Sequence, residues 1–267
     1  MARMPKALLL AGVTSLAFAA PLAHAADPPA PAPEPETPTN SFTGKLAIYS
    51  EYEYRGISQT SEKPAGQLNL DYAHKDGFYL GTFLSNIKWL KDTAEVGGFS
   101  TRANVEWDIY AGFKFEPVKD WTMDVGYLRY QYPRSKEFNP SPNTDEIYAG
   151  LTYDIATLKY SYSFNNTFGV PNSDRSGYLE LSAAKEIFPK FTVNALVGRQ
   201  WYHGNVNGFD NDQLSYTVYK AGVTYDFGHG INVGAYYKGT SAEKDFYTFK
   251  GRDWSKSRLV GFVTYSF

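Results

Sequence analysis

Charged side chains at alternate positions are the first residues in this sequence that could carry chemistry. Glu51, Glu53 and Arg55 are separated by single residues, and Asp71 follows in the next segment with the same spacing from Gln67. Alternate residues of an extended strand point to one face, so we predict a charged patch on one side of a hairpin, just below its outer loop. The patch could act as a selectivity site for a polar solute, as rings of charge do in channels. The interpretation that we favour is a salt-bridge network that fills a narrow interior.

Residues suited to covalent or metal chemistry are sparse. The chain has no cysteine, and beyond the first 25 residues its histidines are His74, His203 and His229. No G-x-S-x-G elbow and no H-x-x-x-H spacing occurs in the sequence. We therefore predict no catalytic residues, no metal ligands and no cofactor. Hydrolysis of membrane lipid is kept only as a lesser alternative.

A period-two pattern shows which elements must position the charges. Between residues 103 and 115, Trp107 and Ile109 share one face with other apolar residues, while Glu106 and Asp108 share the other. This alternation is typical of strands whose faces meet different solvents. We predict strands over 43-55, 65-74, 77-86, 103-115, 121-132, 144-154, 156-165, 176-186, 190-202, 213-227, 230-240 and 256-267.

The connections between these strands alternate between tight turns and longer polar loops. The tight turns fall near residues 74-77, 116-120, 154-156, 186-189 and 227-230. The long loops centre on 56-64, 87-102, 133-143, 166-175, 203-212 and 241-255. An even number of strands with this alternation is expected of an all-β transmembrane, antiparallel up-and-down barrel. We predict about twelve strands, short periplasmic turns, longer extracellular loops and both termini in the periplasm.

Counting faces along each strand assigns a mixed, slightly acidic set of charges to the interior. These pore-lining and selectivity candidates are Glu51, Glu53, Arg55, Asp71, Glu106, Asp108, Lys114, Asp124, Glu146, Lys159, Glu180, Lys220, Lys238 and Arg258. The same face carries glycines, namely Gly81, Gly112, Gly126, Gly150, Gly198, Gly222 and Gly234. Glycine weakens a strand, so these glycines either receive tyrosines such as Tyr110, Tyr148 and Tyr236 or widen the interior.

Two arginines and several aromatic residues fall on the opposite, lipid-facing side. Arg129 and Arg199 lie near the outer strand ends, where a guanidinium could bind lipopolysaccharide phosphate. Aromatic girdles at the two membrane interfaces are predicted at Trp107, Trp121, Trp201, Tyr225, Tyr265 and Phe267. The alternating strand that ends on Phe267 is also the kind of signal that outer-membrane assembly machinery recognises.

The N-terminal residues predict export. Arg3 and Lys6 precede an apolar run and an Ala23-His24-Ala25 site, which indicates a signal peptide over 1-25. Residues 26-42 are rich in proline and predict a periplasmic linker, with the barrel over 43-267. The formal net charge is -2, and removal of the two leader cations makes it -4, which argues against nucleic acid as a partner. No later apolar run reaches the roughly 18 residues of a spanning helix.

Two stretches resemble a known family. They are S-E-Y-E-Y-R-G-I-S-Q-T at 50-60 and P-A-G-Q-L-N-L-D-Y-A-H-K-D-G-F-Y-L-G-T-F-L-S-N at 64-86, with weaker similarity at 107-112 and 146-153. They are similar to the opening of the TorF-like porins of proteobacteria, although Phe83 stands where that family would have Trp. The resemblance implies an outer-membrane pore and supplies no substrate.

The sequence as a whole favours a channel for passive diffusion of small polar solutes in the bacterial outer membrane. The alternative is a structural or surface-interaction barrel without an open pore. A twelve-stranded barrel lies between the filled eight-stranded and the open sixteen-stranded kinds, so sequence leaves both interpretations open. Expected partners are outer-membrane lipid, lipopolysaccharide, the assembly machinery and the solutes themselves.

Overall fold

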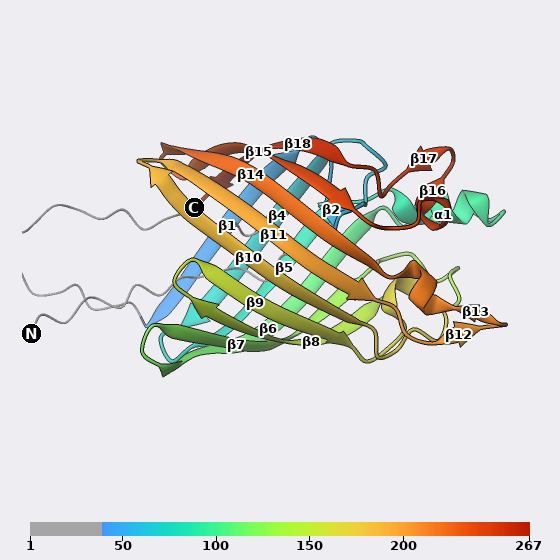
Figure 1. Cartoon of the computed structure of the whole chain (residues 1–267), viewed down its shortest axis with the longest axis horizontal. Coiled ribbons are helices and arrows are strands. Elements are labelled where there is room, and N and C mark those ends of the chain that lie inside the picture. Colours follow the sequence, from blue (N-terminus) through green and yellow to red (C-terminus); the bar gives the residue numbers. More distant parts are fainter. Residues whose placement is uncertain (1–38) are drawn as a thin grey trace, which may run out of the picture.

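Twelve antiparallel strands close into one barrel, as the alternating pattern predicts (Figure 1). A computed structural model describes residues 39–267; the predicted signal peptide and the linker up to residue 38 lie outside the described residues. Each strand pairs with its sequence neighbours, and the first strand pairs with the last. The barrel strands are β1 Asn40–Tyr49, β4 Ala65–His74, β5 Phe78–Asn86, β6 Val105–Val118, β7 Trp121–Gln131, β8 Thr144–Tyr153, β9 Ala156–Ser163, β10 Gly177–Phe188, β11 Phe191–Trp201, β14 Tyr216–Gly228, β15 Ile231–Thr240 and β18 Arg258–Ser266.

The outer wall of the barrel is apolar and its inner wall is polar. On β6, Trp107, Ile109 and Phe113 are exposed, whereas Glu106 and Asp108 are buried. The same alternation runs through all twelve strands, so a wide apolar band faces outward. Such an area would be unfavourable in water but is suited to lipid, where closure of the sheet also leaves no unpaired edge.

Tight turns connect the strands at one end of the barrel. Asp120, Asp154, Lys190 and His229 each take a positive φ there, between 48° and 70°. In two of the turns a glutamate four residues back accepts the backbone N–H, from Asp120 at 3.0 Å and from Lys190 at 2.7 Å. The C-terminus lies at the same end (Figure 1).

Longer loops at the opposite end contain short elements of their own. These are β2 Glu53–Tyr54, β3 Ile57–Ser58, α1 Trp89–Val96, η1 Thr167–Gly169, β12 Asn205–Val206, β13 Phe209–Asp210, η2 Asn211–Leu214, η3 Lys244–Tyr247, β16 Thr248–Phe249 and β17 Arg252–Asp253. The helix α1 was not expected from the strand pattern. None of the described helices is long and apolar enough to span a membrane.

The first predicted strand, 43-55, is wrong at both ends. β1 begins at Asn40, where it already pairs with His74, and ends at Tyr49. Ser50 donates its N–H to Gly261 O, and the chain then turns away from the wall. Only Lys45 to Tyr49 pair with β18, so this seam is short, and Phe267 lengthens it by exchanging two backbone hydrogen bonds with Gly44.

Inward glycines receive aromatic rings, which supports the first of the two roles considered for them. A Cβ on Gly198 would lie 2.3 Å from the Tyr178 hydroxyl, and one on Gly126 would lie 2.3 Å from the Tyr148 hydroxyl. Gly150 differs, because its nearest neighbours would be 3.8 Å away. Most of these glycines therefore let tyrosines lie flat across the inner wall.

Candidate functional site in the barrel interior

The segment Ser50–Pro64, here called the inward loop, folds into the barrel instead of extending outward. Its β2 and β3 strands form a small hairpin, and Arg55 (φ 47°) and Gly56 (φ 82°) make the two-residue turn. The tip reaches across the lumen, because Arg55 hydrogen-bonds to Glu146 on β8 and to Gln200 on β11. On its other side, a Cβ on Gly56 would contact Thr240 on β15 at 2.5 Å and Val218 on β14 at 2.7 Å. The inward loop therefore crosses the lumen near its loop-side end.

Arg55 anchors the tip to one wall through a forked ion pair. Its Nη1 and Nη2 donate to the two carboxylate oxygens of Glu146 at 3.0 and 2.8 Å, and Nη1 also donates to Gln200 at 2.8 Å. The guanidinium lies 4.2 Å from the centroid of the Tyr178 ring. Arg55 is 4 % exposed and Glu146 1 %, so the pair is screened from water. Bidentate geometry of this kind is among the strongest that two charged side chains make.

Glu53 anchors the same hairpin to another wall. Its carboxylate forms an ion pair with Lys220 on β14 and accepts the Gly56 N–H at 2.7 Å. Lys238 on β15 donates to the Gly56 carbonyl at 2.9 Å. Glu53 and Lys238 are both 0 % exposed, which shows how tightly this half of the lumen is filled.

Tyrosines of the inward loop contact the acidic wall. Tyr52 donates to Glu106, which also accepts from Tyr132 at 2.8 Å. The hydroxyls of Tyr54 and Tyr130 hydrogen-bond to each other. Asp108 is 4 % exposed, and its Oδ1 has no hydrogen-bond partner among the described residues. The Glu106 carboxylate is therefore stabilised by two tyrosine hydroxyl groups.

Long loops at the loop-side end of the barrel, together with Arg258 on β18, hold the inward loop in place. The Ser58 N–H donates to Trp254 O at 3.0 Å, and Arg258 donates to Glu62 at 2.5 Å. Ser61 donates to Asp92 on α1, and Lys88 pairs with the same carboxylate at 2.7 Å. Burial opposes ionisation of Asp92, but these hydrogen bonds outweigh it and hold the Asp92 pKa below its ordinary value.

The turn-side half of the lumen is less crowded. Lys114 and Asp124 lie 3.8 Å apart, with side chains 17 % and 21 % exposed. Asp71 accepts from Tyr110 at 2.5 Å, and Lys159 lies 4.0 Å from the centroid of the Tyr148 ring. Charged groups in this half are thus reached by solvent and hydrogen-bonded to tyrosines.

The predicted charged patch is divided between these two halves. Glu51, Glu53 and Arg55 lie inside the barrel but on the inward loop, which corrects their assignment to the first strand. Asp71 lies on β4 and contacts Tyr110, away from Arg55. The other candidates belong to the inner wall: Glu106, Asp108, Lys114, Asp124, Glu146, Lys159, Glu180, Lys220, Lys238 and Arg258.

Sequence reasoning missed several residues that hold the inward loop. Tyr52 and Tyr54 would point to lipid on a continuous strand, yet both are buried in the lumen. Gln200 and Trp254 were not singled out either. A signal was present, since Arg55-Gly56 between Tyr54 and Ile57 fits a two-residue hairpin turn with glycine at a positive φ.

The two lipid-facing arginines differ in the hydrogen bonds that their guanidinium groups already make. Arg129 donates to both oxygens of Asp145 at 2.9 Å, whereas Arg199 contacts Thr217 at 3.3 Å. The predicted girdle residues lie at both ends of the barrel wall, with Trp107 and Trp201 on the loop side. The others, on the turn side, are Trp121, Tyr225, Tyr265 and Phe267.

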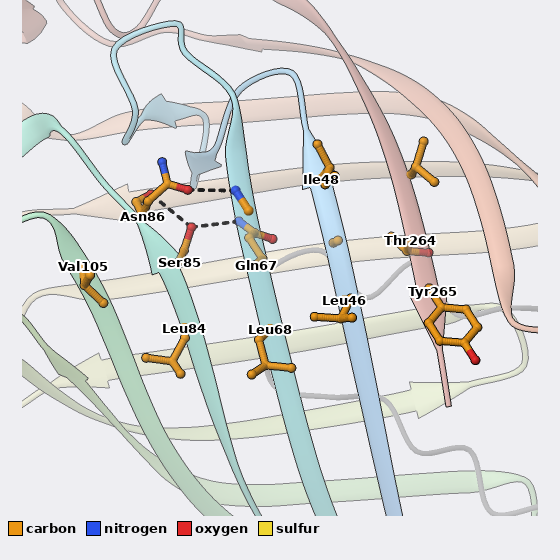
Figure 2. A pocket seen from close by; sticks show the side chains of 13 residues that line it. Leu46, Ile48, Gln67, Leu68, Leu84, Ser85, Asn86, Val105, Thr264 and Tyr265 are labelled. Carbon is orange, nitrogen blue, oxygen red and sulfur yellow. Dashed lines mark hydrogen bonds between the residues drawn. The ribbon is translucent and has the colours of Figure 1, made fainter.

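A groove of about 580 Å³ on this outer wall has no chemistry suited to a polar solute. Figure 2 shows Leu46, Leu68 and Leu84 along it, on neighbouring strands. At its upper end the Asn86 side chain accepts the Gly66 N–H at 2.8 Å, in place of a strand partner. The groove is apolar and open to the lipid side.

The fold is that of bacterial outer-membrane channels. A structure described as the KdgM porin aligns with a TM-score of 0.53 at 10% identity, over 84% of this chain and 99% of that one. The NanC porin aligns at 0.55 and 12%, over 85% and 99%. An outer-membrane channel from Pseudomonas putida F1 aligns at 0.53 and 13%, over 90% and 100%. At such identities the likeness shows a shared fold.

The chain belongs to the family described as "Bacterial protein of unknown function (Gcw_chp)", whose model matches residues 32–267. No curated protein matches the sequence. The TorF-like resemblance stays a prediction. Because this family description assigns no function, the proposed function rests on the residues inside the barrel.

Proposed function

We propose that this protein is an outer-membrane channel for passive diffusion of small polar solutes, with the inward loop as its constriction. The observation that best supports this proposal is that charged residues line the lumen of the closed barrel along its whole length. A barrel that only needed filling would be served by apolar side chains, since buried ion pairs add little stability over well-packed apolar groups. The TorF-like resemblance and the channel fold of the structural neighbours agree with this proposal.

One observation favours the alternative, a structural or surface-interaction barrel. The inward loop seals the loop-side half, where Glu53 and Lys238 have no exposed surface. Under the channel proposal this loop must move or narrow the path without closing it permanently. Conductance therefore separates the two functions.

The test is single-channel conductance of the purified protein and of a variant with a shortened inward loop. Gln59 donates its N–H to Tyr52 O at 2.8 Å, so replacing residues 53-58 by Gly-Gly retains a closed hairpin. We expect conductance in both proteins and a several-fold larger value in the variant. The matched control makes the same Gly-Gly replacement at residues 206-209 of the β12–β13 hairpin, which projects away from the lumen (Figure 1). It should leave conductance unchanged. No conductance in any of the three would favour the structural barrel.

The proposal includes export by the signal peptide and periplasmic termini. The tight turns would then face the periplasm and the long loops the exterior. External protease on intact cells should cleave within 87-102, 133-143 or 241-255 and spare the turns. Cleavage confined to residues 74-77, 116-120 or 227-230 would invert this topology.

Assembly and lipid contacts complete the proposal. Deleting Phe267 should lower the yield of folded barrel, through a weakened assembly signal and through loss of its two hydrogen bonds to Gly44. Phe267→Tyr retains both bonds and should restore the yield. An unchanged yield on deletion would show that the C-terminal strand is not an assembly signal.

Of the two lipid-facing arginines, Arg199 is the better lipopolysaccharide contact, because the Arg129 guanidinium is already paired with Asp145.

A further inference from the structure

Charges of opposite sign lie on opposite walls of the loop-side half. The acids are Glu106 and Asp108 on β6 and Glu146 on β8; the bases are Lys220 on β14, Lys238 on β15 and Arg258 on β18. In the closed ring, three strands (β9, β10 and β11) separate β8 from β14, and three others (β1, β4 and β5) separate β6 from β18. The two walls therefore face each other across the lumen, and the field between them runs across the path and not along it.

The inward loop carries charges that match both walls at once. Arg55 pairs with Glu146 on the acidic wall, and Glu53 pairs with Lys220 on the basic wall. Glu51 lies 3.7 Å from Arg258, also on the basic wall. In the structure, this space therefore holds a short stretch of chain that presents a cation to the acidic wall and carboxylates to the basic wall.

In the proposed channel, a solute that passes here would take the place of these charges. A singly charged ion would satisfy one wall and leave the buried groups of the other unpaired, which is unfavourable in a low-dielectric space. A neutral molecule would satisfy neither. A small molecule with a cationic group and a carboxylate can satisfy both together.

A hollow between the inward loop and the start of β18 has the same mixed character. The hollow has a volume of about 370 Å³ and is lined by Glu51, Glu62, Lys256 and Arg258, together with Ser50 and Leu259. Two acids and two bases therefore lie together beside the inward loop. We infer, on the basis of the proposed channel function, that the preferred solutes are small zwitterions, such as amino acids or short peptides.

The test is uptake of four labelled solutes of similar size into proteoliposomes that contain the full-length protein. γ-Aminobutyrate is a zwitterion at neutral pH, 4-hydroxybutanamide is its uncharged isomer, and butyrate and butylammonium carry single charges. We expect the protein to raise entry of γ-aminobutyrate, relative to protein-free liposomes, several-fold more than it raises entry of the other three. Equal rates for the two isomers would overturn the zwitterion preference and leave the channel intact.

Variants of the paired charges test which residues produce the preference for zwitterions. Replacing both partners of each pair, Arg55→Gln with Glu146→Gln and Glu53→Gln with Lys220→Gln, removes each ion pair as a whole and should abolish the preference while the uncharged isomer still enters. The matched control, Lys114→Gln with Asp124→Asn in the turn-side half, should retain it. If the four-site variant keeps the preference, the two walls are not its source. If no protein, including the variant with the shortened inward loop, raises entry of any solute above that in protein-free liposomes, the proposed function itself fails.

Discussion

The two halves of the lumen use similar residues in different ways. In the loop-side half, Arg55 and Glu146 are fully enclosed and joined by two hydrogen bonds near 3 Å. In the turn-side half, Lys114 and Asp124 lie 3.8 Å apart and are both partly exposed. An enclosed charge depends on its partner, whereas a hydrated charge is screened by water and salt. The comparison indicates that each loop-side charge acts together with its partner, while the hydrated turn-side charges act singly on simple ions that pass.

The largest expected effect is on stability. Arg55→Ala leaves the buried Glu146 carboxylate without its cation and should lower the free energy of unfolding by about 3–5 kcal/mol. Lys114→Ala, the matched change in the other half, should cost less than about 1 kcal/mol. Denaturant unfolding in detergent measures both. Equal losses would show that the two halves do not differ in this way.

The next effect concerns the glycines beneath the tyrosines. Gly198→Ala places a methyl group 2.3 Å from the hydroxyl of Tyr178, whose ring stacks on Arg55. The forced shift should cost about 1–3 kcal/mol. Gly150→Ala is the control, because its nearest neighbours would be 3.8 Å away, and it should change stability by less than about 0.5 kcal/mol. A fall in melting temperature for Gly150→Ala as large as that for Gly198→Ala would contradict the packing role.

Ion selectivity should follow the turn-side charges. Asp124→Asn removes a hydrated carboxylate and should shift the reversal potential toward anions, by up to about fivefold in permeability ratio, since the interaction is on the order of 1 kcal/mol. The shift should shrink at high salt. Glu146→Gln should instead lower stability with little change in reversal potential. The reverse pattern would place the selectivity site in the inward loop.

The smallest effect is a dependence on acid at the outer loops. The folded-state pKa of Asp92 is lowered, so its contribution is present above its ordinary value of 3.8 and is lost as pH falls through the lower, folded value. Protease should therefore reach the Ser61 region more readily near pH 3 than at pH 7. Asp92→Asn lacks the titrating group and should show no such difference. A pH dependence that survives in this variant would come from another group.

The sequence determined the barrel because its signals are local. Alternation on β6, from Glu106 to Phe115, separates the two faces without knowledge of any other strand. Asp120 and Lys190 lie in turns and the polar stretches lie in loops for the same reason, since turn chemistry involves only a few neighbouring residues. The inward charges of these wall strands follow from the same counting.

Only the tertiary structure decided what happens between Tyr49 and Ala65. Glu51, Glu53 and Arg55 alternate as a strand would, and the same alternation is compatible with a loop that turns inward. Arg55 and Glu146 are 91 residues apart in the chain, so their pairing depends on closure of the ring. Whether an enclosed charge is stabilised or strained depends on that distant partner, and local spacing carries no information about it.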